Sequence, residues 1–494
     1  MNDSENNKPL KQPKPVYKSF WQRVAIVSFV FLLFVMITLS LIYYHVIGWN
    51  FKAPDWVRNS IEIRSAEALG SAELNFDALD LLIDSSLKPQ VLMTNVKLTT
   101  KTGIEIIAFS EVRAELSLSH LIQGQLQLTN MSVSGVFVSL RRLPNGSIVV
   151  SGGLDITAPH QQAATVAQLI NRFDRLLNLP ILADLTSAEI QALNLQIEDQ
   201  SLERIWTIDG GRLSFKRDGN TIQAKTDLAL LNGGQGVATL EANYKSIIGT
   251  TAADFGLNIK DIEAGDLAAL APPFAWLNVL HAPISGSLMG GITDEGSLLP
   301  VNATLAIGEG VLQPIDETRP IPFSSARSYF RYDPALSILT FDELSVVSPW
   351  ITGEMIGQAF LDVSDIGGFE NLVGQFKSNT VQVNPDDLYT EAISIESVEM
   401  DFKLLLNPFR LHIGQLLLHD NGQTLQAEAN LETEPDGWSY NFDAHLDGLS
   451  SERLLAIWPS GLKPRTRRWI SENIIAGSLR NIDAVLRGQP GLKP

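Results

Sequence analysis

The stretch VEMDFKLLL, residues 398–406, decides the fold class because apolar and polar side chains alternate strictly over its first seven residues. An extended strand sends successive side chains to opposite faces of a sheet. Val398, Met400, Phe402, Leu404 and Leu406 therefore share one apolar face, while two carboxylates and a lysine lie on the other. The pattern predicts a strand with one face buried and one face in water, which is typical of antiparallel sheets.

The same alternation recurs from about residue 60 to the C-terminus, for example in EVRAELSLSH (111–120), ALNLQIED (192–199) and VNATLAIG (301–308). Short turns such as RDGN (217–220) and HDNGQ (419–423) separate the stretches and suit hairpins. We therefore predict a mainly β protein, built as an elongated antiparallel meander that is apolar on one face throughout. The side chains expected on this face are Leu116, Leu118, Leu193, Leu195, Ile197, Leu228, Leu305, Val398, Met400, Phe402, Leu404, Leu406, Tyr440 and Phe442.

Helices are expected at few places. TVAQLINRFDRLLN, residues 165–178, has an apolar stripe at helical spacing, and Pro180 ends it. We expect this amphipathic helix to pack on the sheet as a cap; a mobile lid or a membrane-surface helix is the alternative.

Two distant stretches look alike. FGLNIKDIEAGDLAAL (255–270) and FDAHLDGLSSERLLAI (442–457) each predict a strand followed by a short helix, and a Gly-Ser-Leu sequence follows each of them. Such repetition indicates a sheet that grows by adding similar strand units, with chance similarity of β-rich sequence as the alternative.

The composition excludes several classes of protein. The chain has 494 residues, which corresponds to about three domains, and its net charge is −18. A nucleic-acid partner is not expected, because such a protein needs a basic face to neutralise phosphates. The absence of cysteine excludes disulfides, thiolate metal sites and cysteine nucleophiles.

The N-terminal region contains VAIVSFVFLLFVMITLSLI, residues 24–42, which is apolar except for two serines and one threonine. With the residues that follow, it reaches the roughly 20 residues that span a bilayer. No small-residue cleavage site is evident, so we expect a retained anchor rather than a signal peptide. The basic residues before it predict a cytoplasmic N-terminus, with the chain after about residue 50 outside the cytoplasm, which in a Gram-negative cell is the periplasm.

These observations divide the chain into successive segments. We expect a cytoplasmic tail, an inner-membrane anchor that contacts the membrane through residues 24–47, an N-terminal β module, an amphipathic helix, and repeated groove modules. The corresponding ranges are 1–20, 21–47, 55–155, 156–184 and 185–494.

No motif in the sequence carries a reaction. There is no G-x-S-x-G, no H-E-x-x-H, no Walker loop and no G-x-G-x-x-G. His412 and His419 are seven residues apart, which on one continuous strand places them on opposite faces, and adjacent carboxylates such as Asp386 and Asp387 are expected to be solvated. We therefore predict a non-enzymatic protein with no catalytic residues, no cofactor and no metal.

The informative feature is the apolar face, which something must cover. Successive meanders that close into sandwiches are one solution. The other is one long sheet curved into an open hydrophobic groove, filled by lipid acyl chains that gain about 0.8 kcal/mol for each CH₂ removed from water. The sequence alone leaves both solutions open.

A resemblance favours the groove. The order of a short basic tail, one anchor and then β-strands resembles the AsmA-like superfamily of Gram-negative envelope proteins. Residues 110–150 resemble the N-terminal module of that family, with basic residues at Arg141 and Arg142 before an Asn145-Gly146 turn. Residues 455–488 are similar to the central domain of YhdP-type members, through Trp458-Pro459, Pro464, Arg468-Trp469, Glu472-Asn473 and Gly477.

The resemblance implies a β-groove anchored in the inner membrane that conducts phospholipid toward the outer membrane without catalysis. Members of the family are usually much longer, so the chain is expected to be a fragment or a short member. An outer-membrane or periplasmic protein is the implied partner. The rival hypothesis is an assembly factor or scaffold that holds client β-proteins through exposed strand edges.

One segment remains unusual. Pro464 suits the first turn of a helix, but Arg465, Arg467 and Arg468 then lie at its positive end. We expect these arginines to pair with acidic side chains of the protein, or alternatively with a lipid headgroup or an acidic partner.

Overall fold

The computed structural model describes most of the chain. The described residues are 17–46, 51–55, 57–59, 61–63, 72–84, 88–100, 103, 105–123, 125, 127–142, 148–150, 154–155, 166–199, 204–231, 236–270, 277–363, 369–385, 388–389, 391–461, 463–474 and 476–490. Most of the expected cytoplasmic tail, the Asn145-Gly146 turn, the start of the segment 156–184, and Asp386 with Asp387 lie outside the described residues.

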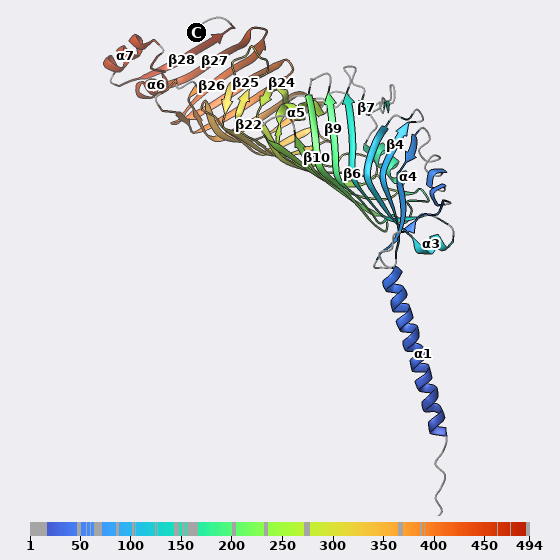
Figure 1. Cartoon of the computed structure of the whole chain (residues 1–494). Coiled ribbons are helices and arrows are strands. Elements are labelled where there is room, and N and C mark those ends of the chain that lie inside the picture. Colours follow the sequence, from blue (N-terminus) through green and yellow to red (C-terminus); the bar gives the residue numbers. More distant parts are fainter. Residues whose placement is uncertain are drawn as a thin grey trace, which may run out of the picture.

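The N-terminal helix α1, Tyr17–Val46, stands apart from the rest of the molecule (Figure 1). None of its apolar stretch Val24–Leu41 is buried against other parts of the chain. The helix is long and apolar enough to cross a membrane, consistent with the predicted single-pass anchor.

The rest of the chain is dominated by one sheet of 25 strands, which is curved and does not close into a barrel (Figure 1). Its first strands are β1 (Phe51–Lys52), β2 (Ala72–Asn75), β3 (Ala78–Ile83), β4 (Pro89–Thr100), β5 (Glu105–Leu116), β6 (Leu128–Arg142), β7 (Ile148–Val150), β8 (Leu154–Asp155) and β9 (Ser187–Asp199). The sheet continues through β10 (Arg204–Asp218), β11 (Thr221–Leu231), β12 (Val237–Ile247), β13 (Ala253–Glu263), β15 (Pro283–Ile292), β16 (Val301–Ile307), β19 (Ser325–Asp333), β20 (Ile338–Val347) and β21 (Ile351–Val363). It ends with β22 (Phe369–Val383), β23 (Ile393–Ile395), β24 (Ser397–Leu406), β25 (Phe409–Asp420), β26 (Gln423–Glu434), β27 (Gly437–Ser450) and β28 (Ser478–Gly488).

From β9 onward nearly every strand pairs antiparallel with the next long strand in the sequence. The exception to the meander is the parallel pair β6–β9, whose connection of residues 143–186 supplies the long crossover that a parallel pair needs. A small second sheet contains β14 (Leu280–His281), β17 (Gly310–Leu312) and β18 (Ile321–Phe323). The described strands therefore form one long sheet rather than several sandwiches, as the groove solution requires.

Two predicted hairpins show why their sequences turn. Gly219 follows β10 with φ of +57°, and Asp218 pairs with Thr221 across the turn. Asn421 and Gly422 have φ of +51° and +72° between β25 and β26. Two successive residues with positive φ make the tight turn that matches the twist of a hairpin, and Asn-Gly is the preferred sequence.

The expected strand 111–120 is shorter than predicted. Strand β5 ends at Leu116, and the short helix α3, Leu118–Ile122, follows it. The Ser117 hydroxyl contacts Ser119 Oγ at 3.0 Å and His120 Nδ1 at 2.9 Å, and such local bonds compete with strand pairing. Leu118 is consequently exposed on a helix, and its prediction as an apolar-face residue is wrong.

Other helices lie against the sheet, among them α4 (Val166–Leu177), α5 (Ala264–Leu270), α6 (Ser451–Ile457) and α7 (Pro464–Asn473). Helix α4 buries Ile170 and Leu177 against sheet residues such as Ile222 and Ala253. The predicted amphipathic helix is therefore packed on the sheet as a cap.

The two similar stretches form the same supersecondary unit. In the first, β13 leads into α5 and the chain re-enters the sheet as β15; in the second, β27 leads into α6 and the chain re-enters as β28. The Gly-Ser-Leu sequence lies inside β15 but spans the beginning of β28.

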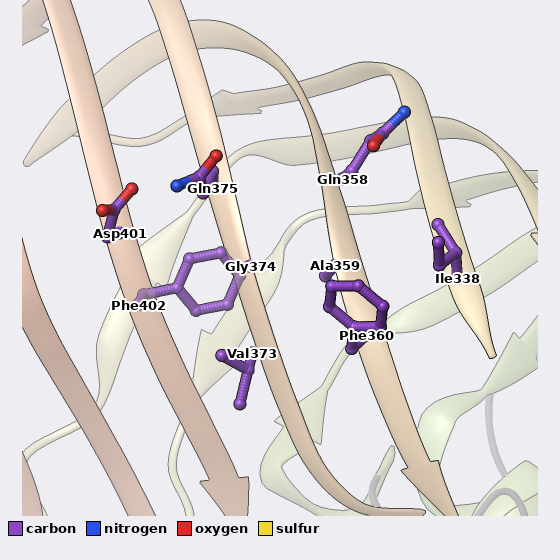
Figure 2. A pocket seen from close by; sticks show the side chains of 9 residues that line it. All are labelled: Ile338, Gln358, Ala359, Phe360, Val373, Gly374, Gln375, Asp401 and Phe402. Atoms are coloured by element: carbon purple, nitrogen blue, oxygen red, sulfur yellow. The ribbon is translucent and has the colours of Figure 1, made fainter. Parts of the chain in front are cut away.

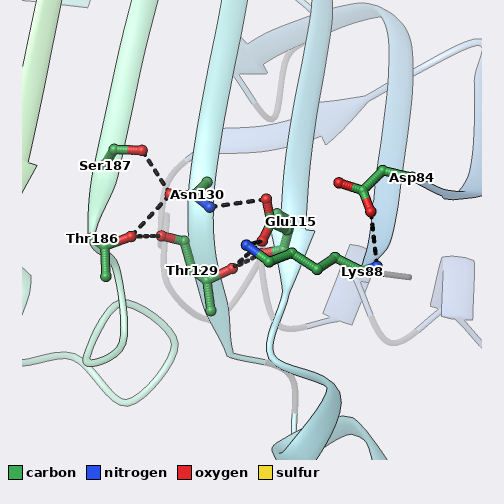
Figure 3. A network of polar contacts seen from close by, with 7 residues as sticks. All are labelled: Asp84, Lys88, Glu115, Thr129, Asn130, Thr186 and Ser187. Atoms are coloured by element: carbon green, nitrogen blue, oxygen red, sulfur yellow. Dashed lines mark hydrogen bonds and ion pairs between the residues drawn. The ribbon is translucent and has the colours of Figure 1, made fainter. Parts of the chain in front are cut away.

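A polar network stabilises the unusual parallel pairing (Figure 3). Asn130 donates to Glu115 at 2.9 Å and accepts from the Ser187 hydroxyl at 2.7 Å, which joins β5, β6 and β9. Lys88 forms an ion pair with Glu115 at 2.5 Å. The hydrogen bond from the Lys88 ammonium to the Glu115 carboxylate raises the pKa of the lysine. Thr186 also donates to the Asn130 amide oxygen, so the start of β9 is fixed beside the start of β6.

Candidate functional site

One face of the sheet, which we call the inner face, carries apolar side chains in register from strand to strand. Leu228 on β11 lies opposite Leu240 on β12, and Ala303 on β16 lies opposite Phe330 on β19. Further along, Phe402 on β24 lies opposite Ile413 on β25, and the inner face continues to β27, where Phe442 pairs with Ala429 of β26. The inner face is thus continuous along the meander.

The two faces of the sheet differ sharply in exposure. On the inner face Ala359 is 1% and Phe402 6% exposed, whereas Phe360 on the outer face is 60% and Ile356 is 52% exposed. The hydrophobic cluster around Phe402 contains only inner-face residues of strands β20 to β25, with no helix among its members. Side chains of a single sheet bury one another in this way where the face is concave, because curvature brings them together.

Aromatic rings line this concave section. Phe376 and Phe402 stack with centroids 5.0 Å apart, Phe341 meets Phe376 at 5.2 Å, and Phe330 meets Phe341 at 5.8 Å. Glycine makes room for them: a Cβ on Gly357 would come within 2.5 Å of the Phe376 ring. We call the four phenylalanines the aromatic cluster.

The inner face has two long edges, where the strands begin or end. The edge that contains the starts of β11, β13 and β27 is covered near β11–β15 by α4, through Ile170 and Leu177, and we call it the α4 edge. The opposite edge contains the starts of β12, β15 and β19. Helix α5 covers it by burying Ala264 and Leu267 beside Ile284, and we call it the α5 edge. Between the two helices, inner-face residues such as Leu228, Leu257 and Leu288 are only half-buried.

A buried polar group lies under α4. Asp174 is 6% exposed and accepts a hydrogen bond from the Gly249 amide at 2.8 Å. Tyr244 lies on the inner face nearby, and burial, the largest cause, together with the Asp174 charge raises the pKa of its hydroxyl. These groups fix α4 to the turn after β12.

A cavity of about 400 Å³ lies beside the aromatic cluster (Figure 2). Most of its lining side chains belong to the outer face by their register, including the exposed Phe360 and the polar Gln358, Gln375 and Asp401. Ala359, Gly374 and Phe402 form its base. The cavity is therefore a depression of the outer face above small residues, rather than a part of the inner groove.

All the predicted apolar-face residues except Leu118 lie on the inner face by register. Leu116 is buried, and the others are buried or half-buried, with Phe402 the most buried of those on β24. Whether these side chains contact lipid stays a prediction. The sequence analysis missed Phe330, Phe341 and Phe376, although each lies in an alternating stretch that would have revealed its face.

The two histidines of β25 lie on the same face, contrary to the prediction. A bulge between Ile413 and Leu416 shifts the alternation, so that His412 and His419 both lie on the outer face. Each has its own neighbour, since His412 contacts Asn430 at 2.6 Å and His419 contacts Thr424 at 2.9 Å. Within the described part of the chain, no three histidine, aspartate or glutamate side chains are grouped in a way that could hold a metal ion.

The three arginines of α7 do not share one environment. Arg467 donates to the carbonyls of Leu455 at 2.9 Å and Trp458 at 3.1 Å, at the C-terminal end of α6. The negative end of one helix thus compensates a cation at the positive end of the next. Arg465 and Arg468 are exposed, and among the described residues neither forms an ion pair, so the expected pairing with acidic side chains is not found.

Comparisons with protein-family models, with curated proteins and with solved structures find no match for this chain. The class of protein is therefore defined by the structure: a chain with one apolar N-terminal helix and one long, curved, open β-sheet.

Proposed function

We propose that the protein is a non-enzymatic lipid carrier, which holds phospholipid acyl chains on its inner face and is anchored in a membrane by α1. The observation that carries the proposal is the continuity of the inner face, which stays apolar from strand to strand and only half-buried between α4 and α5. An apolar surface of this extent is unfavourable in water unless a ligand covers it.

The energetics suit a lipid. Two ordinary acyl chains gain roughly 20 kcal/mol gross when their CH₂ groups leave water at about 0.8 kcal/mol each. Because a bilayer offers the same gain, the net free energy of transfer from bilayer to groove is near zero, which allows movement along the groove. The direction proposed, from the inner to the outer membrane of a Gram-negative cell, rests on the AsmA-like resemblance and on the basic residues before α1.

Lipid extraction tests the proposal. The protein is purified in mild detergent, extracted with solvent and examined by mass spectrometry, and we expect co-purified phospholipid. Leu404→Asp places a charge on the inner face and should abolish it. Phe360→Asp, on the exposed outer face of β21, is the matched control and should retain it.

Photocrosslinking gives an independent readout if Leu404→Asp fails to fold. A photoreactive residue at Leu228 on the inner face should crosslink to lipid, whereas one at Asp227, its outer-face neighbour, should not. Absence of phospholipid from the wild-type extract, together with equal crosslinking at both positions, would contradict the proposal.

The rival hypothesis, a scaffold for client β-proteins, predicts the opposite crosslinks. Crosslinks from strand edges to a protein, with none from Leu228 to lipid, would favour it.

A further inference from the structure

We infer that residues 313–320, between β17 and β18, form a strap that closes the groove over the aromatic cluster and is latched by Trp438. This inference concerns regulation of the proposed groove and rests on the proposed function only for its ligand.

The start of the strap, and the residue after the strand β18 that follows it, are held at the α5 edge. The Gln313 amide donates to the Val279 carbonyl at 2.9 Å, just before β14, and the Ser324 amide donates to the Val347 carbonyl at 2.7 Å, at the end of β20. By the register of the meander, Val347 lies at the edge where β19 and β21 start, and Val279 shortly precedes β15, which starts at the same edge.

The C-terminal half of the strap reaches the opposite edge. The Trp438 indole donates to the Arg319 carbonyl at 2.7 Å, across 119 residues of sequence. Trp438 lies at the start of β27, where Gly437 pairs with the last residue of β26, and this is the α4 edge. A Cβ built on Gly437 would lie 3.4 Å from the Glu317 carbonyl, so the strap passes directly beside this turn.

The strap has an ordered conformation of its own. Thr318 is 2% exposed, and its hydroxyl donates to the Ile315 carbonyl at 2.6 Å. The Gln313 amide group donates to the carbonyls of Asp316 and Thr318. The Arg319 guanidinium also lies over the Trp350 ring at 5.6 Å, and Trp438 meets Phe409 edge-on at 5.5 Å.

These contacts close the section of sheet that contains the aromatic cluster. The strands from β19 to β27 run between the α5 edge, where the strap is held, and the α4 edge, where Trp438 binds it. The buried Ala359, Phe376 and Phe402 lie on their inner face. Acyl chains of a lipid can therefore enter this section only when the strap lifts or slides, whereas the section around Leu228 stays open.

The natural absence of cysteine makes thiol labelling a direct test. Ala359→Cys introduces one thiol inside the closed section, and Leu228→Cys introduces one in the open section. In detergent, a maleimide reagent should label Cys at 228 rapidly and at 359 slowly. Trp438→Ala should raise the rate at 359 by roughly fivefold or more, the order expected for losing one hydrogen bond and one ring contact. Trp469→Ala, an exposed tryptophan on α7, is the control and should leave the rate unchanged.

A second arm closes the strap. Cysteines at Glu317 and Asp436, joined by a short bismaleimide, should hold the latch shut, so that a photoreactive residue at Met400 no longer crosslinks to lipid while one at Leu228 still does. Equal rates of maleimide labelling at residues 359 and 228 would contradict the strap. So would a labelling rate at 359 that does not change in Trp438→Ala. A different outcome separates the two proposals. If Trp438→Ala raises the labelling rate at residue 359, but neither Met400 nor Leu228 crosslinks to lipid, the strap is supported and the proposed lipid function is contradicted.

Discussion

At the scale of single residues, small side chains decide how tightly the sheet can curve. Gly374 on β22 faces Phe402 on the inner face, and a Cβ there would lie 2.4 Å from the Gln358 carbonyl and 2.5 Å from Ala359 Cβ. Backbone atoms of an adjacent strand cannot move aside as a flexible side chain can. The close approach of these strands therefore depends on the absence of a side chain.

We expect Gly374→Ala to destabilise the protein by about 1–3 kcal/mol, the usual cost of overpacking. Gly414→Ala is the matched control, since a Cβ at that position meets nothing closer than 3.6 Å. Chemical denaturation followed by tryptophan fluorescence measures the difference. Equal stability of the two variants would contradict the close packing.

His445 makes the last strand pair depend on pH. Its Nδ1 lies 2.8 Å from an Asp483 carboxylate oxygen on β28, and this hydrogen bond, followed by the influence of Asp447, raises the pKa of the imidazole above its ordinary value of 6.5. A raised pKa in the folded state stabilises the fold below the unfolded value, and the stabilisation is lost as the pH rises through the folded value. Hydrogen-exchange protection of β28 should therefore be full below about pH 6.5 and should fall as the pH rises above this value. In His445→Asn, protection should not show this fall.

At the scale of elements, the short helix α4 covers one edge of several strands. Leu177 of α4 packs against β11, and Ile170 packs against β13 and β15. The amphipathic stripe of α4 was evident in the sequence because apolar spacing is a local property. The strands that it covers could not be predicted, because they follow α4 by tens of residues.

Leu177→Ala should cost about 2–5 kcal/mol, since the side chain is 4% exposed and its removal leaves a cavity. Leu179→Ala, two residues later and 42% exposed, is the control and should cost little. Limited proteolysis between α4 and β9 offers a local readout, with faster cleavage expected only in Leu177→Ala. Similar cleavage of both variants would show that α4 is not anchored in this way.

Bulges and local side-chain bonds limit how well the alternation of apolar and polar residues predicts single strands. The alternation of Val398–Leu406 is kept in the structure, and its residues face as predicted. In β25, by contrast, one bulge reverses the alternation and brings His412 and His419 to the same face. The alternation of EVRAELSLSH also continued past the true end of β5, because bonds of the Ser117 hydroxyl end the strand.

At the scale of the whole molecule, an exposed apolar helix and a curved sheet with an apolar inner face lie in one chain (Figure 1). In the proposed function both features lie in hydrocarbon, the helix in a membrane and the inner face against acyl chains. On that proposal, we expect the membrane and the groove to exchange the same molecules.

A variant lacking residues 1–46 tests the anchor separately from the groove. We expect the full chain to require detergent for extraction from membranes, and the shortened chain to be released by neutral buffer because no spanning helix remains. The shortened chain should still co-purify with phospholipid when it is offered detergent-solubilised lipid. Firm membrane association of the shortened chain would show that the sheet itself binds the bilayer.

The sequence by itself determined most of the strands and their two faces, the apolar helix α1, the amphipathic helix α4 and the absence of cysteine chemistry. These properties depend on the period of the side-chain pattern and on composition, which are local. Only the tertiary structure decided between one long sheet and several sandwiches, placed α4 and α5 on opposite edges, and brought Arg319 to Trp438. Those outcomes depend on how twist and curvature accumulate over many strands, and on bulges and glycines whose effects add up far from where they occur.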